Sequence, residues 1–139
     1  LMADVLKQLV ESKNTATAFK KNLAIEDKKN YKDQIKASKD IITKIDKLIA
    51  VYIGSVDKRQ GITRNPEVTV SRRYSSARRY VGSRFGHLTT TEKLLISQYK
   101  KALETAISET NAFFDTEWKA YKTTLETIRI SPFKEVQKF

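Results

Sequence analysis

The fold of this chain is decided by residues 89–130, which read TTTEKLLISQYKKALETAISETNAFFDTEWKAYKTTLETIRI. Apolar and aromatic side chains recur there at steps of three and four, at Ile96, Tyr99, Leu103, Ile107, Thr110, Phe114, Trp118, Tyr121, Leu125 and Ile128. The mean step is near the α-helical period of about 3.6 residues, and a helix over this stretch would be about 63 Å long. Thr89 and Glu92 match the capping-box pattern. We therefore predict one long helix over 89–130.

Three shorter amphipathic segments precede this helix. Apolar side chains recur at helical spacing from Met2 to Leu23, from Tyr31 to Tyr52, and over residues 67–85. The core positions predicted for the third segment are Val70, Tyr74, Ala77, Val81 and Phe85. Residues 54–66 contain two glycines and a proline, which is typical of a loop. With no strand pattern, the chain is predicted to be all-α, a four-helix up-down bundle with a long C-terminal helix.

The composition excludes several kinds of chemistry. The chain has no cysteine and one histidine, so it offers neither a disulfide nor a thiolate metal site. His87 lies in a turn with no local partner that would make it a general base, and no glycine-rich phosphate loop is present. We therefore expect no enzyme activity, no cofactor and no metal. No run of about 18 apolar residues exists, so we also expect no membrane span.

The positive charge is unevenly distributed. The net charge is +11, and residues 57–88 alone hold eight basic and two acidic side chains. Arginine and tyrosine alternate in this segment, a combination that binds phosphates and stacks on bases. The candidate interaction residues are Lys58, Arg59, Gln60, Arg64, Arg72, Arg73, Arg78 and Arg79.

Two interpretations of the arginines remain open. In a helical projection Arg72 and Arg79 face away from the predicted core, while Arg73 and Arg78 flank it on opposite edges. Such arginines can bind nucleic acid, or they can pair with acids on neighbouring helices such as Asp40, Asp46 or Glu104. Because they surround the helix and do not form one stripe, we rank nucleic acid behind a solvated or ion-paired surface. A basic helix lying on an anionic membrane ranks lower still, since aspartates interrupt the lysines of residues 28–47.

Several short sequences in the chain also match a known type of domain. They are Asp57-Lys-Arg-Gln-Gly-Ile-Thr-Arg-Asn-Pro66, Tyr80-Val-Gly-Ser-Arg84, Thr91-Glu92, Asn111-Ala-Phe-Phe, Trp118-Lys-Ala-Tyr121 and Ser131-Pro-Phe-Lys134. In these sequences the chain resembles the helical domain that follows a sortilin-like, BNR-repeat β-propeller in glycosidase-like secreted proteins of Bacteroidetes-type bacteria. The resemblance covers most of the chain, best over 57–134, and implies a periplasmic or extracellular location. It assigns no catalytic residue to this domain.

Together these features predict one helical domain over residues 1–139 that belongs to a longer protein, since Leu1 precedes Met2. The expected function is that of a non-catalytic structural or interaction module at the C-terminus of an exported β-propeller protein. The alternative is a basic nucleic-acid-binding domain that uses Arg72, Arg73, Arg78 and Arg79. The expected partners are the upstream domain, through the 57–66 loop, and a second protein. The sequence leaves the oligomeric state open.

Overall fold

The computed structural model describes residues 1–55, 68–83 and 85–128, and these form helices with no strand among them. The all-α class is confirmed, as are four helices with a long C-terminal one. In chain order the elements are α1 (Met2–Asp27), α2 (Lys32–Ile53), α3 (Val70–Gly82), α4 (Thr90–Phe113), a π-helical segment η1 (Phe114–Trp118) and α5 (Lys119–Glu126).

Local signals in the sequence explain where the helices begin and end. The capping box is confirmed: Glu92 N–H donates to Thr89 Oγ1, and Thr89 N–H donates to Glu92 Oε2 at 2.7 Å. Thr69 caps α3 in the same way, since its hydroxyl accepts from the Arg72 N–H at 3.1 Å. Gly54 ends α2 with φ at 90°, a conformation that glycine adopts without steric cost.

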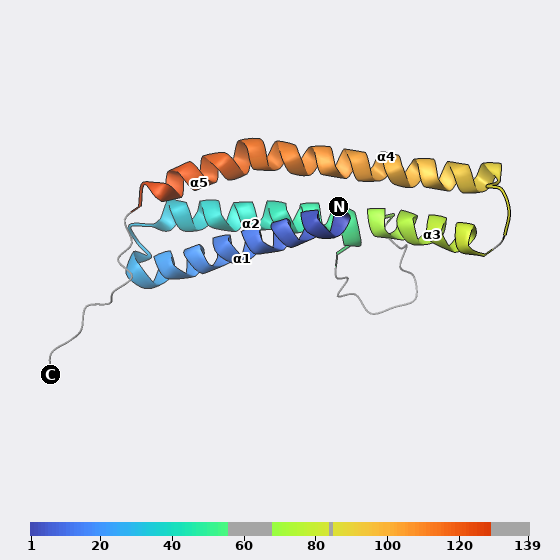
Figure 1. Cartoon of the computed structure of the whole chain (residues 1–139). Helices are drawn as coiled ribbons and strands as arrows, with labels where there is room; N and C mark the ends of the chain where they lie inside the picture. The colour runs from blue at the N-terminus through green and yellow to red at the C-terminus, as the bar shows by residue number, and fades with distance from the viewer. Residues whose placement is uncertain (56–67, 84, 129–139) are drawn as a thin grey trace.

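The helices are arranged along one long axis (Figure 1). The α1 helix runs antiparallel to α2 and packs mainly on it, and α3 continues in the direction of α2 beyond its end. The α4–η1–α5 helix runs back along both, with α3 against the first half of α4 and α2 against the remainder. The up-down four-helix arrangement is therefore not confirmed, because α3 lies end to end with α2 and not beside it. Helical periodicity defines the apolar face of each helix but not the helix that covers it.

The prediction of one long α-helix over residues 89–130 needs a correction, because the helix is not α-helical throughout. It passes through one π-helical segment at Phe114–Trp118, which adds a residue to the turn. The sequence pattern placed Phe114 in the core stripe and Phe113 outside it, whereas Phe113 is buried and Phe114 is half-buried. The wider π turn lets Phe113 and Tyr121 face the same core although they are eight residues apart.

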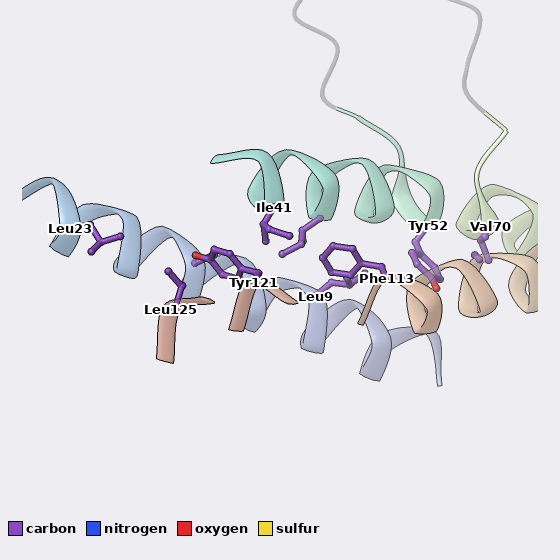
Figure 2. Packing of buried hydrophobic residues seen from close by; sticks show 11 residues of the cluster. Leu9, Leu23, Ile41, Tyr52, Val70, Phe113, Tyr121 and Leu125 are labelled. Atoms are coloured by element: carbon purple, nitrogen blue, oxygen red, sulfur yellow. The ribbon is translucent and has the colours of Figure 1, made fainter. Parts of the chain in front are cut away.

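One cluster of buried side chains connects the helices (Figure 2). In α1 every fully buried side chain lies in the predicted stripe, at Leu9, Ala16 and Leu23. The α2 and α4–α5 helices complete the cluster with Ile41, Ile45, Tyr52, Ala106, Phe113, Tyr121 and Leu125. In α3 only Val70 and Ala77 are buried. Tyr74, Val81 and Phe85, predicted for the core, are exposed because none of the described helices other than α4 lies alongside α3.

Two buried hydroxyl pairs connect α2 to α4 and α5. Tyr52 Oη and Thr110 Oγ1 are hydrogen-bonded at 2.9 Å, and Tyr121 Oη donates to Ser38 Oγ at 2.8 Å. Burial raises the pKa of both tyrosines above the ordinary value of 10.0, and the hydrogen bonds oppose this only in part. Burial therefore keeps both tyrosines protonated to a higher pH than in the unfolded chain.

The raised pKa values predict that the two tyrosines make the free energy of unfolding depend on pH. Their contribution is complete below the unfolded-state pKa of 10.0 and is lost as the pH rises through the higher folded-state pKa, because the unfolded chain releases these protons first. We expect the Tyr52→Phe/Tyr121→Phe double variant to lose less stability than wild type between about pH 9 and about pH 11, measured by urea denaturation. Tyr80→Phe, at an exposed tyrosine, is the control. Equal losses in all three proteins would contradict the prediction.

Candidate interaction surface

The part of the molecule that carries the described half of the predicted site residues is α3 together with the first half of α4. We call residues 68–83 and 85–101 the arm, which extends beyond α1 and the end of α2 (Figure 1). Val70 and Ala77 are buried between its helices, and the Tyr74 and Tyr99 rings lie 5.3 Å apart across them. Arg73 donates from Nη1 to Gln98 Oε1 at 3.3 Å. These contacts hold α3 against the first half of α4 within the arm.

The arginines of the arm lie where the helical projection placed them. Arg72 and Arg79 are exposed, and so is Arg78, while Arg73 is half-buried beside Gln98. Glu92 is the sole carboxylate among the described residues from 68 to 103, and it takes part in the capping box. This end of the molecule is therefore strongly positive.

The predicted ion pairs of these arginines do not form. Within residues 1–55, 68–83 and 85–128, no carboxylate lies within ion-pair distance of Arg72, Arg78 or Arg79. Asp46 instead pairs with Lys13 of α1 at 2.6 Å. The cause is the placement of α3 beyond the end of α2, which separates its arginines from the α2 aspartates.

Apolar side chains are also exposed on the arm. Phe85 is fully exposed, and the same hairpin also exposes Val68, Tyr80, Val81, Leu88 and Leu94. Single exposed apolar residues are ordinary on protein surfaces, but a concentration of them on one hairpin is typical of a binding surface. The arm therefore combines cations with apolar area.

A groove that the sequence did not indicate runs along one side of α4. Three adjoining hollows of about 160, 480 and 520 Å³ form it, and each shares lining residues with the next: Val68, Arg73 and Gln98 join the first two, and Val51 and Glu109 join the last two. We call this the α4 groove. One wall is α4 from Leu95 onward, and the other is α3 followed by α2. The sequence feature that could have indicated the groove is the set of small residues on α4, such as Ala102 and Ala112. This feature is weak, because alanines are common at the edges of helices.

The α4 groove lies on the side of α2 opposite to α1. Asp46, on one edge of α2, pairs with Lys13 of α1. Lys44, two residues earlier and so about 200° around the helix, pairs with Glu117 in the wall of the groove. The α1 helix thus covers one side of the α2–α4 seam, and none of the described helices covers the other.

The other predicted site residues, Lys58, Arg59, Gln60 and Arg64, lie outside the described residues. Within the described part of the chain, no three histidine or carboxylate side chains gather where they could hold a metal ion. None of the described helices is long and apolar enough to cross a membrane. What the arm and the α4 groove offer is cationic and apolar surface for binding.

Comparison with protein-family models, with curated proteins and with solved structures finds no match to this chain.

Because α3 has two buried side chains, Val70 and Ala77, we predict that it can be detached without unfolding the rest. Ala77→Glu would place a carboxylate in the α3–α4 contact, where burial of an unpaired charge is costly. We expect amide hydrogen exchange over 70–82 to rise at least about tenfold, with little change over 32–53. Ser75→Glu, on the exposed side of the same helix, is the matched control. A uniform rise along the chain would show that α3 is integral to the core.

Proposed function

We propose that this chain is a non-catalytic interaction module of a larger exported protein, and that the arm and the α4 groove are the surfaces that bind its partner. The observation that carries the proposal is the concentration of unpaired arginines and exposed apolar side chains on an arm that extends beyond α1 and α2. A solvated structural surface needs neither exposed aromatics nor a run of positive charge without acids.

The place of this module in a longer polypeptide is the second part of the proposal. The resemblance of residues 57–134 to the helical domain that follows a sortilin-like, BNR-repeat β-propeller supports a C-terminal position and export. Catalysis would then reside, if anywhere, in the upstream domain.

The size and location of the full protein test this proposal. An antibody raised against residues 1–55 should detect, in fractionated source cells, a band far above 16.0 kDa in the exported fraction. A cytoplasmic marker protein on the same blot controls for leakage between fractions. A band near 16 kDa in the cytoplasm would contradict both the larger protein and the export.

Nucleic acid binding is the second candidate function. The exposure of Arg72, Arg78 and Arg79 without carboxylate partners favours it, as does the exposed Tyr80 ring beside them. Three phosphate contacts to a single strand would give a slope of about −2 for log affinity against log salt concentration.

A comparison of two triple variants separates the two functions. We expect Arg72→Ser/Arg78→Ser/Arg79→Ser and Lys28→Ser/Lys29→Ser/Lys32→Ser to weaken binding of a labelled single-stranded oligonucleotide equally. Both variants remove three exposed charges, and attraction to the overall charge of +11 does not depend on their position. The measurement is fluorescence anisotropy across a salt series. Loss confined to the arginine variant would establish a nucleic-acid site on α3.

A further inference from the structure

The α4 groove is long enough to hold a helix. Its wall on α4 extends from Leu95 to Glu117, a distance of about 33 Å along the helix axis, which a helix of about 20 residues would match. Three α4 residues lining it are alanines, Ala102, Ala106 and Ala112, and small side chains allow a second helix to approach closely. The shape therefore favours a helix in the groove over a compact ligand.

The lining of the groove requires an apolar face on that helix. Leu48, Val51 and Phe113 come from the α2–α4 seam, and Val68 precedes α3. Val51 is 41% exposed and Val68 is 69% exposed, so both have apolar area left to bury. An amphipathic helix placed here would cover that area with side chains at i, i+3, i+4 and i+7.

The rim of the groove selects for negative charge. Five cations line it, Lys44, Lys47, Arg72, Arg73 and Lys101, against the two carboxylates Glu109 and Glu117. Glu117 and Lys44 pair with each other, which leaves four cations and Glu109 along the rim. A second copy of this chain would bring a protein of net charge +11 against these cations, which opposes self-association.

From this shape, lining and charge we infer that the α4 groove binds an acidic amphipathic helix of a partner protein. This inference rests on the proposed function and specifies the partner. The bound helix would lie beside α4 on the side opposite to α1 and complete a four-helix cross-section with α1, α2 and α4. Its acidic edges would face the lysines and arginines of the rim, which set its orientation and association rate more than its affinity.

The experiment uses the full chain and a labelled synthetic peptide of about 20 residues, with leucine and alanine on one helical face and glutamate on both edges. Its control is a scrambled peptide of the same composition, which keeps the charge and loses the apolar face. Binding is measured by fluorescence anisotropy. We expect the amphipathic peptide to bind at least about tenfold more tightly than the scrambled one.

Two pairs of variants locate the binding. Val51→Glu places a like charge in the floor of the groove and is matched by Val10→Glu on α1, where the valine is similarly exposed. Lys101→Glu reverses a rim charge and is matched by Lys100→Glu, its exposed neighbour outside the lining residues. We expect Val51→Glu to weaken peptide binding at least about tenfold, because it disrupts the apolar contact. We expect Lys101→Glu to weaken it at least about threefold, mainly through a slower association rate, and each control to change it less than about twofold. Circular dichroism checks that all four proteins are folded.

Three outcomes would overturn the inference. The first is equal binding of the amphipathic and scrambled peptides, or no binding of either at about 100 µM, because the groove would then not recognise an apolar helix face. The second is equal effects of the groove and control variants. The third is a dimer in sedimentation velocity that Val51→Glu dissociates, since the groove would then belong to a second copy. If any of these outcomes is observed together with a band far above 16.0 kDa in the exported fraction, the proposed interaction module is retained. The acidic amphipathic helix is then rejected as its partner.

Discussion

The register between α2 and the α4–α5 helix is the constraint on which the rest of this structure depends. Two buried hydroxyl pairs set it, Tyr52 with Thr110 near one end of the seam and Tyr121 with Ser38 near the other. A buried hydroxyl without a partner costs about 1–3 kcal/mol. Sliding one helix along the other would leave the two tyrosine hydroxyls unsatisfied, whereas Thr110 and Ser38 keep hydrogen bonds to carbonyls of their own helices. The apolar contacts between the pairs are less selective, because side chains such as Ile45 and Leu48 can pack in several registers.

The π-helical segment and the α4 groove both lie along the seam that this register fixes. Thr110 and Tyr121 are held against α2 on either side of the π turn at Phe114–Trp118. Phe113 is then directed into the core. The same alignment brings the alanine-rich edge of α4 beside Leu48 and Val51 of α2, on the side that α1 does not reach. The groove is therefore a consequence of where two polar contacts fix the helices.

The arm differs from the rest of the molecule in what holds it and in what it exposes. Its buried aliphatic side chains are Val70 and Ala77, whereas α1 and α2 share a longer buried stripe. Because little apolar area is buried there, aromatic and aliphatic side chains remain exposed beside unpaired arginines. A segment with few buried contacts and much charge is poorly suited to stabilising a core and well suited to binding a second molecule.

The sequence by itself determined the helices, their capping and most of the faces they bury. The capping box at Thr89 and Glu92, the end of α2 at Gly54, and the burial of Leu9, Ala16 and Leu23 were all readable, because caps and periodicity are local properties of the chain. The outward direction of Arg72 and Arg79 was readable for the same reason. The tertiary structure alone decided that α3 extends α2, that Phe113 and not Phe114 is buried, and that a groove remains along α4. Each of these depends on which helix lies beside which, and pairing between segments distant in sequence has no periodic signal in either segment alone.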